Sequence, residues 1–263
     1  MKANAILVQA RDVRHAFGEG DLRKEVLHGI SCEIYSREIM IITGPSGSGK
    51  TTFLTLIGAL RRLQTGSVTL LGQELRGAKP QALVEARRAI GFIFQEHNLL
   101  PAFTACENVQ LALAVEPGLS SLQCRTRAMD LLSAVGMSEH VYKRPAQLSG
   151  GQRQRVGVAR ALAADPEILL MDEPFAALDP VTRAELQREF EQLAKRLKKT
   201  IVFVTHDLRE ALLLASRIVL LQNGKIVASD TPQNFMKLEH PEVQAFAASL
   251  GDIRAGHGDG AVR

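Results

Sequence analysis

A glycine-rich octapeptide constrains this chain more than any other feature of its sequence. It reads Gly44-Pro45-Ser46-Gly47-Ser48-Gly49-Lys50-Thr51 and fits the pattern G-x-x-x-x-G-K-[ST] in full, between an apolar run at 39–43 and a helix-like run at 52–60. Glycines let successive backbone N–H groups converge on one anion, and the following helix N-terminus adds partial positive charge. The pattern predicts a phosphate-binding loop for a nucleoside triphosphate, in which Lys50 reaches the β and γ phosphates and the Thr51 hydroxyl is a ligand of Mg²⁺. An ordinary glycine-rich surface turn is disfavoured, because the motif and both flanking elements occur together.

Two adjacent acidic residues follow a second apolar run. Asp172 ends the run 168–171, and Glu173 comes next. Because ligands of open α/β sheets bind at the carboxyl edge of the strands, we expect Asp172 to hold Mg²⁺ through water. A second acid beside the metal can orient the attacking water or accept its proton, so Glu173 is the candidate general base. Taken alone, Glu173 would be interpreted as a solvated loop acid.

Apolar runs and helix-like segments alternate along the chain, which argues for an α/β core. Residues 168–171 and 201–204 are continuously apolar, as buried strands of a parallel sheet are. Asp179-Pro180 supplies an N-cap and a first-turn proline for a helix with an apolar stripe from 186 to 197. Asn223-Gly224 predicts a type I′ hairpin turn. Further short strands are expected at 5–8, 13–17, 39–43 and 67–71, and a helical insertion at about 80–163.

The composition is that of a globular protein. Of the 263 residues, 46% are hydrophobic and 23% are charged. The longest apolar stretches are interrupted, for example by Arg217, and fall short of the ~18–20 residues that cross a bilayer. The N-terminus shows no long apolar core, so no secretory signal is expected. The 3 cysteines show neither metal-ligand spacing nor a complete disulfide set, which is typical of a reducing compartment.

A second serine and glycine cluster, Leu148-Ser149-Gly150-Gly151-Gln152, leads into a helix-like run at 153–164. It offers another anion-binding helix N-terminus, but with no lysine and no preceding strand it cannot form an independent nucleotide site. The pentapeptide resembles the signature of ATP-binding cassette (ABC) ATPases, and the other motifs occur in that family's order over about residues 5–232. The resemblance implies an α/β fold: a P-loop NTPase core with an N-terminal antiparallel β-subdomain and an inserted α-helical subdomain.

The resemblance also implies a role for each motif. Phe17 matches the aromatic residue that stacks on adenine, Gln95 the glutamine of the Q-loop, Ala177-Leu178-Asp179 the D-loop, and His206 the switch histidine. Singly, Phe17 would more often be core packing, and Gln95 or His206 a capping or core residue. The catalytic residues are expected to be Glu173, His206 and Gln95, and the metal ligands Thr51, Gln95 and Asp172. The expected ATP contacts are Phe17, Gly44, Pro45, Ser46, Gly47, Ser48, Gly49, Lys50, Thr51, Thr52, Ser149, Gly150, Gly151, Gln152 and Asp179.

The family implies a mechanism with two cassettes. They face each other head to tail, so that Ser149 and Gly151 of one contact the γ-phosphate held by Lys50 of the other. ATP with Mg²⁺ joins the two, and hydrolysis lets them separate. One set of motifs is present, so a second cassette is required; a homodimer is the simple interpretation, and an unlike partner cassette stays open.

The branch of the family is inferred from residues outside the catalytic motifs. Residues 92–101 and 104–109 resemble the lipoprotein-release and macrolide-export branch, and residues 43–45, 54–58 and 71–75 are most similar to the ATPases of heterocyst-type glycolipid exporters. This implies an ATP-hydrolysing subunit of a membrane export complex on the cytoplasmic face of the inner membrane. Its partners would be a permease and a periplasmic adaptor.

Three alternatives belong to the same superfamily. A mechanotransmission ATPase of the cell-division type would move a periplasmic domain and transport nothing. A nucleic-acid-associated cassette is disfavoured, since no heptad run is present and the arginines at 87–88 and 153–155 lack interleaved aromatic residues for base stacking. A translation-associated protein would carry two cassettes. No direct contact with nucleic acid is expected.

We expect one domain over residues 1–235, with the catalytic core at about 1–94 and 165–235 and the helical subdomain at about 95–164. Residues 236–263 exceed the usual cassette length, are expected to be partly disordered and have no assigned function. Arg37 stands where many relatives have a glycine. If its φ is positive, arginine costs on the order of 1 kcal/mol there.

Overall fold

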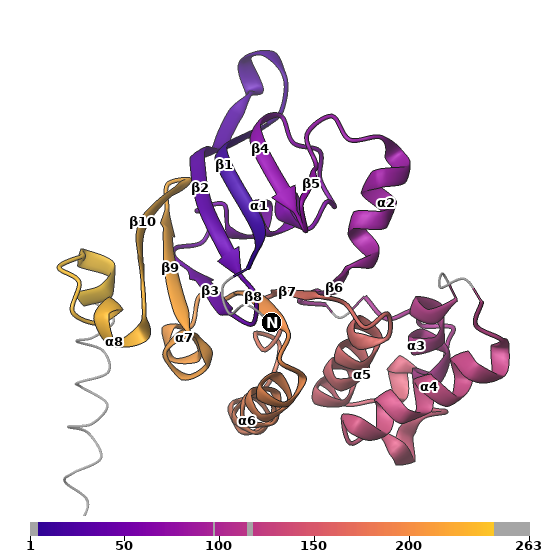
Figure 1. Ribbon diagram of the computed structural model, residues 1–263. Coiled ribbons are helices and arrows are strands. Elements are labelled where there is room, and N and C mark those ends of the chain that lie inside the picture. The colour runs from indigo at the N-terminus through magenta and orange to yellow at the C-terminus, as the bar shows by residue number, and fades with distance from the viewer. Residues whose placement is uncertain (1–4, 97, 115–117, 245–263) are drawn as a thin grey trace, which may run out of the picture.

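A six-stranded sheet forms the centre of the computed structural model, which describes residues 5–96, 98–114 and 118–244, apart from the side chains of 194–197. Its order is β10-β9-β3-β8-β7-β6 (Figure 1). The strands β9, β3, β8, β7 and β6 run parallel, and β10 pairs antiparallel with β9 through the two-residue turn Asn223-Gly224. Both turn residues have positive φ, 47° and 70°, as a type I′ turn requires. The strands are β3 Ile39–Thr43, β6 Ile90–Ile93, β7 Ile168–Asp172, β8 Thr200–Val204, β9 Arg217–Gln222 and β10 Lys225–Asp230.

Side chains of the central strands alternate between two hydrophobic cores, one on each face of this sheet. In β8, Ile201 and Phe203 join the core shared with the helices, whereas Val202 and Val204 join the core beneath the second sheet. Both faces are covered, which explains why these strands are apolar throughout.

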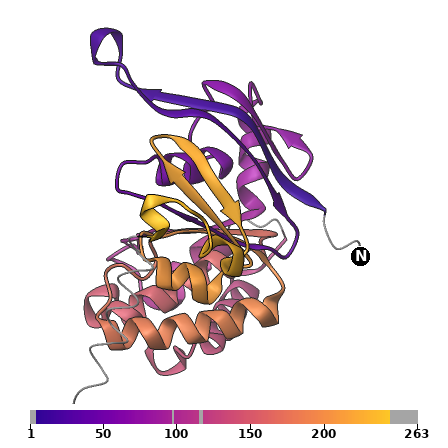
Figure 2. The same cartoon turned by 90° about the vertical axis from the view of Figure 1, so that its left-hand side faces the viewer.

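The second sheet is antiparallel and has the order β2-β1-β4-β5 (Figure 1). In Figure 2 its long indigo strands lie at the top, on the side away from the orange helices. Two short strands were expected at 5–8 and 13–17, but β1 Ile6–Phe17 is continuous. The polar break between them is a bulge, in which Asp12 adopts a φ of 46° and the pairing with β2 shifts register after Ala10. The remaining strands are β2 Lys24–Tyr35, β4 Thr65–Leu70 and β5 Gln73–Glu74.

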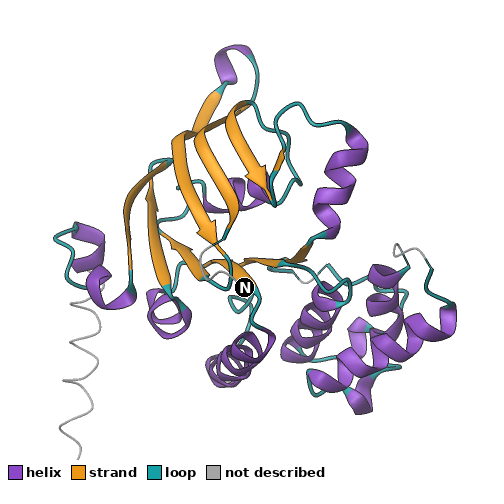
Figure 3. Cartoon of the chain, in the orientation of Figure 1, coloured by secondary structure: helices purple, strands orange, loops and turns teal. Residues whose placement is uncertain are grey.

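A group of helices lies beside the sheets (Figure 3). α3 Ala105–Leu113, α4 Ser121–Ala134 and α5 Gly150–Leu162 share one hydrophobic core. The expected helical insertion at 80–163 begins too early, because β6 follows α2 Pro80–Arg88 and pairs with β7 inside the central sheet. The other helices are α1 Lys50–Ile57, α6 Pro180–Leu197, α7 Leu208–Leu214 and α8 Pro232–Phe235, with 3₁₀ turns at Gly20–Leu22, Ser138–His140 and Pro145–Gln147.

The expected fold class, an α/β P-loop core with an antiparallel β-sheet and inserted helices, is confirmed. Beyond α8, Val243 is 2% exposed and belongs to the core that the helices share. Residues 245–263, most of the expected C-terminal extension, lie outside the described residues. Among the residues described, no helix has the length and apolar character that a membrane span requires.

Candidate nucleotide-binding site

The glycine-rich loop connects β3 to α1, as its sequence predicts. Gly44, Gly47 and Gly49 have φ values of 140°, 77° and 102°, which L-residues rarely adopt. A Cβ on Gly44 would lie 2.0 Å from the Leu221 carbonyl oxygen, and a Cβ on Gly49 would lie 2.5 Å from Leu27 Cδ2. Glycine is therefore required at both positions for the loop to take this shape.

Lys50 begins α1 and is almost fully buried. Its Nζ donates hydrogen bonds of 2.9 Å to the carbonyl oxygens of Gly44 and Pro45, so the side chain lies back across the loop. Burial lowers the pKa of Lys50, and the carboxylates of Glu173 and Asp172 oppose that shift. The ammonium group therefore lies within the electrostatic reach of both acids that the sequence singled out.

Thr51 and Asp172 meet across the carboxyl edge of the central sheet. The Thr51 hydroxyl donates a 2.9 Å hydrogen bond to Asp172 Oδ1. Burial raises the pKa of Asp172, and the neighbouring Glu173 raises it further. Hydroxyl and carboxylate oxygens are the donors that Mg²⁺ prefers. Among the described residues, no three His, Cys, Asp or Glu side chains gather into a metal-binding group, so a metal here would need further ligands such as phosphate oxygens.

Glu173 and His206 also meet, from the ends of β7 and β8. His206 Nδ1 lies 3.1 Å from Glu173 Oε2. Glu173 adopts a φ of 44°, and its N–H donates to the carbonyl oxygen of Val204 at 2.9 Å. The backbone therefore turns sharply directly after the strand, which brings the carboxylate to the histidine.

The segment that carries His206 is anchored by residues that the sequence analysis missed. The Thr205 hydroxyl donates a 2.6 Å hydrogen bond to Glu210 Oε2, and Gln187 Nε2 donates to Glu210 Oε1 at 2.9 Å. Burial raises the pKa of Glu210, which is 4% exposed. Glu210 lies four residues after His206 on α7, but nothing in the sequence alone shows that its carboxylate is turned inward.

The second glycine cluster faces α6 rather than the phosphate loop. Ser149 caps α5 and forms a reciprocal capping box with Gln152. A Cβ on Gly151 would lie 2.7 Å from Thr182 Cγ2, and one on Gly150 would lie 3.3 Å from Leu178 Cδ2. The cluster thus packs against the start of α6 within one chain. Its expected contact with a second cassette stays a prediction.

Three further expected residues lie outside the glycine-rich loop. Gln95 is exposed and comes two residues after β6, which pairs with β7. Phe17 is 39% exposed, with the Arg61 guanidinium 4.7 Å from its ring centre. Asp179 Oδ1 accepts a 3.1 Å hydrogen bond from the backbone N–H of Thr182 and so caps α6. Of the remaining expected contacts, Ser46 is exposed, Ser48 is buried and Thr52 is half-buried.

A cavity of about 370 Å³ adjoins the loop. Its lining includes Pro45, Ser46 and His206 together with Glu242, beyond α8. Glu242 Oε1 accepts a 2.7 Å hydrogen bond from Gln222 Nε2. The described end of the chain therefore contributes a carboxylate close to the phosphate loop, which no sequence motif indicated.

Comparisons with known proteins place this chain in a family. The family model described as ABC transporter matches residues 27–176. The choline transport ATP-binding protein OpuBA of Bacillus subtilis is 44% identical over 81% of this chain and 55% of the relative. The sulfate/thiosulfate import ATP-binding protein CysA of Photorhabdus laumondii is 38% identical over 94% of this chain and 66% of the relative. An uncharacterized ABC transporter ATP-binding protein of Thermotoga maritima is 43% identical over 82% of this chain and 91% of the relative.

Solved structures of ABC transporter cassettes are also similar to this chain. The dimeric structure of MJ0796, a bacterial ABC transporter cassette, matches with a TM-score of 0.79 and 35% identity over 86% of this chain and 98% of that chain. A dimeric post-hydrolysis state of the same cassette, bound to ADP and Pi, matches with a TM-score of 0.78. The chain spans about half to two thirds of OpuBA and CysA.

The expected export branch requires correction. OpuBA is named for choline transport and CysA for sulfate and thiosulfate import, so these relatives do not support a lipoprotein, macrolide or glycolipid exporter or its periplasmic adaptor. The residues behind that expectation have local structural roles. Thr104 and Glu107 form the capping box of α3, and the buried Asn108 bonds to the backbone of Leu100, Phe103 and Thr104. Such contacts carry no information about transport direction.

The family match over residues 27–176, the α/β cassette fold and the similarity to other cassettes over more than four fifths of this chain agree with one another. This chain belongs to the ABC transporter family.

Proposed function

We propose that this cassette drives a membrane importer of a small polar solute, and that ATP is hydrolysed at the site formed by the glycine-rich loop, Thr51, Asp172, Glu173 and His206. The observation that carries the site assignment is the pair of contacts at one sheet edge. The Thr51 hydroxyl lies 2.9 Å from Asp172 Oδ1, and Glu173 Oε2 lies 3.1 Å from His206 Nδ1. The carboxylates of Asp172 and Glu173 also act to raise the pKa of Lys50.

Each residue has a distinct task in this proposal. The loop N–H groups and Lys50 bind the β and γ phosphates, and Thr51, Asp172 and Gln95 hold Mg²⁺, which supplies charge neutralisation when bound. Glu173 orients the attacking water and accepts its proton. His206, fixed through Thr205 and Glu210, holds the Glu173 carboxylate in place and contacts the γ-phosphate. Phe17 stacks on adenine.

A second cassette completes the site. Ser149, Gly150, Gly151 and Gln152 of one copy, with Asp179, face the ATP held by the other, and a homodimer is the simplest arrangement. The helix N-terminus at Ser149 gives the cluster partial positive charge for a γ-phosphate. The similar cassette MJ0796 is dimeric, which supports a second copy as the partner.

The proposed direction of transport rests on the relatives. OpuBA, at 44% identity, is named for choline transport, and CysA, at 38%, for import of sulfate and thiosulfate. The partner is therefore a permease that takes a small polar solute inward, with this cassette docked on the cytoplasmic face of the membrane. The domain division into a core at 1–94 and 165–235 and helices at 95–164 is part of the same proposal.

Direction can be measured with the assembled complex. Tagged Glu173→Gln protein with ATP would retrieve the permease from detergent-solubilised membranes, and the wild-type complex would then be reconstituted in proteoliposomes. Importer function predicts that radiolabelled solute moves into the compartment that holds the cassette and ATP. Movement out of that compartment would show an exporter, and ATP turnover without movement would show a mechanotransmission ATPase. Recovery of ribosomes or DNA without a membrane protein would overturn the transport function.

A further inference from the structure

The described end of the chain brings a carboxylate to the cavity beside the glycine-rich loop. After α8 the chain continues to Val243, which is buried and, like the buried Phe235 of α8, lines this cavity of about 370 Å³. Both side chains belong to the core that the helices share, so the segment between them is held at each end. Glu242 lies within that segment, is half-buried and lines the same cavity.

A hydrogen bond ties the Glu242 side chain to the strand beside the loop. Gln222 Nε2 donates to Glu242 Oε1 at 2.7 Å, and Gln222 is the last residue of β9. The residue before it, Leu221, packs against the first glycine of the loop, since a Cβ on Gly44 would lie 2.0 Å from the Leu221 carbonyl oxygen. The carboxylate is therefore anchored next to a point where the strand contacts the loop.

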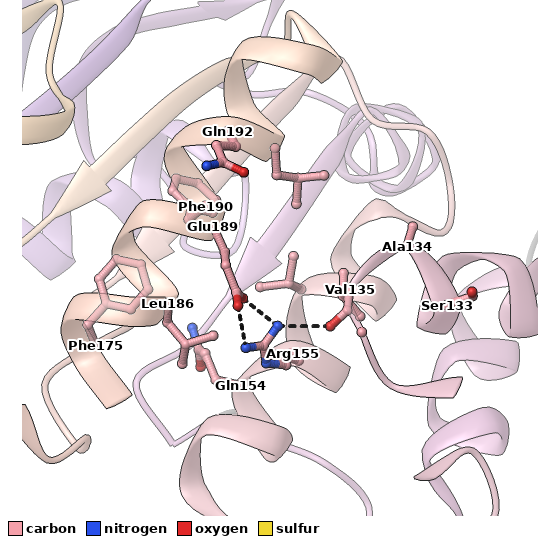
Figure 4. A pocket seen from close by; sticks show the side chains of 13 residues that line it. Ser133, Ala134, Val135, Gln154, Arg155, Phe175, Leu186, Glu189, Phe190 and Gln192 are labelled. Atoms are coloured by element: carbon pink, nitrogen blue, oxygen red, sulfur yellow. Dashed lines mark hydrogen bonds and ion pairs between the residues drawn. The ribbon is translucent and has the colours of Figure 1, made fainter. Parts of the chain in front are cut away.

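The negative charge of Glu242 has no neutralising cation within the part of the chain that the structure describes. The cavity of about 570 Å³ between α5 and α6 offers a comparison, because the charges that line it, those of Arg155 and Glu189, pair with each other at 2.8 Å between Nη2 and Oε1 (Figure 4). Glu242 is bonded instead to the uncharged Gln222, and no described Lys, Arg or His forms an ion pair with it. Its charge is therefore left to act on a ligand beside the loop.

That charge already acts on Lys50. Burial lowers the pKa of Lys50, and three carboxylates oppose this shift, those of Glu173, Asp172 and Glu242. His206 lines the same cavity as Glu242. Because the proposed function places the γ-phosphate of ATP against Lys50 and His206, this phosphate and the Glu242 carboxylate would be like charges in one small space.

We propose that Glu242 sets the preference of this site between ATP and ADP, by holding a fixed negative charge near the position of the γ-phosphate. This assignment rests on the proposed function, in which the glycine-rich loop holds ATP. The charge raises the free energy of bound ATP more than that of bound ADP, because ADP lacks the γ-phosphate and its charge. Glu242 therefore allows ADP to compete with ATP for the loop. It is a specificity-determining residue that acts through space.

The dissociation constants of ATP and ADP for the full chain measure this preference. They are determined by isothermal titration at pH 8 with EDTA, so that no Mg²⁺-dependent hydrolysis occurs. Glu242→Gln removes the charge but keeps an oxygen that accepts from Gln222, and it should tighten ATP binding about three- to tenfold more than ADP binding. Glu242→Lys reverses the charge and should shift the preference still further toward ATP. Glu239→Gln, at an exposed glutamate of the same segment that does not line the cavity, is the matched control and should leave the preference unchanged.

The same preference in wild type, Glu242→Gln and Glu242→Lys would overturn the proposal. An equal change in the affinities for ATP and ADP would also overturn it, since a purely structural role has that effect, as would a shift of the same size in Glu239→Gln. If Glu242→Lys does not fold, Glu242→Gln and Glu239→Gln decide the question. Failure of the proposed function has a different signature: the wild-type protein would bind neither nucleotide, or Lys50→Ala would bind ATP as tightly as wild type. Either result would overturn the ATP site and, with it, the role of Glu242.

Discussion

At the scale of single residues, Glu173 combines an unusual backbone with a specific contact. Its φ of 44° lies in the left-handed region, which is costly for a side chain other than glycine, asparagine or aspartate. Backbone strain of this kind costs roughly 1–3 kcal/mol and tends to occur at functional sites. Here it turns the carboxylate toward His206, which supports the role of Glu173 as the general base.

The first prediction concerns that role. Glu173→Gln keeps the size and the turn of the side chain but cannot accept a proton. ATP turnover should fall by about 10²–10⁴-fold, while ATP binding stays within a few-fold of wild type. Phosphate release and a fluorescent nucleotide titration measure the two quantities. Turnover at the wild-type rate would remove Glu173 from the mechanism.

The charge on Asp172 lowers the stability of the fold, although the proposed Mg²⁺ ligand role requires that charge. Its folded-state pKa is raised, chiefly by burial, so the native state holds its proton more tightly than the unfolded state does. This group therefore adds to the free energy of unfolding below its raised pKa, and that contribution is lost as the pH rises through it. At neutral pH the buried charge is a net cost.

The second prediction follows from the stability cost of the buried Asp172 charge at neutral pH. Asp172→Asn should raise the melting temperature of the nucleotide-free protein at pH 7, because the amide oxygen can still accept the bond from Thr51 without a buried charge. The same change should weaken Mg²⁺-dependent turnover. Thermal denaturation at pH 5 and pH 7 provides the check, and the gain should be larger at pH 7. A lower melting temperature at pH 7 would contradict the electrostatic argument.

Arg37 gives the third prediction. The sequence raised the question whether this turn needs a positive φ, and the structure shows a φ of 64°. Replacement by glycine should relieve about 1 kcal/mol of strain, which corresponds to a rise of roughly 2–4 °C in melting temperature for a domain of this size. Because the Arg37 N–H donates to the Thr200 hydroxyl, Arg37→Ala is the matched control and should give no comparable gain. Equal effects of the two changes would show that strain is absent.

At the scale of elements, the contact between α5 and α6 is set by a glycine. A Cβ on Gly151 would lie 2.7 Å from Thr182 Cγ2, which is closer than real Cβ contacts allow. The fourth prediction is that Gly151→Ala lowers the free energy of unfolding by about 1–3 kcal/mol through overpacking. Adding Thr182→Ser removes the clashing methyl group and keeps the N–H that donates to Asp179. The double variant should recover most of the loss in thermal denaturation, and failure to recover would place the strain elsewhere.

Elements with a strong local pattern could be predicted from the sequence. The turn at Asn223-Gly224, the strand 39–43 and the cap at Asp179 occur as expected, because each depends on neighbours in the chain. The errors at β1 and β6 have a different origin. The bulge at Asp12 and the insertion of β6 into the parallel sheet depend on pairing with strands that are distant in sequence.

In the candidate site, too, the features set by local sequence could be predicted, and the features set by tertiary packing could not. The glycine-rich loop and the two acids were identified from spacing, since their chemistry requires fixed residue types. The inward position of Glu210, the approach of Glu242 to the loop and the unpartnered amide of Gln154 depend on tertiary packing. No local pattern distinguishes a buried glutamate or glutamine from an exposed one on the same helix.

At the scale of the whole molecule, the proposed mechanism gives each chain two half-sites, each of which a second copy completes. In the proposed mechanism the glycine-rich loop binds the phosphates on one side, while the Ser149 cluster lies at the N-terminus of α5 and contacts α6 of its own chain. Two copies arranged head to tail would join each loop to the cluster of the other copy. The central claim is that ATP, and not ADP, holds two copies together.

The molecular mass of Glu173→Gln protein in solution, measured by light scattering after size exclusion, tests this claim most directly. With ATP and Mg²⁺ the mass should be that of a dimer, and with ADP that of a monomer. Glu173→Gln combined with Ser149→Arg should bind ATP but stay monomeric, because the bulky cation blocks the approach of the second copy. A monomer of Glu173→Gln with ATP, or a dimer of the Ser149→Arg combination, would contradict the account.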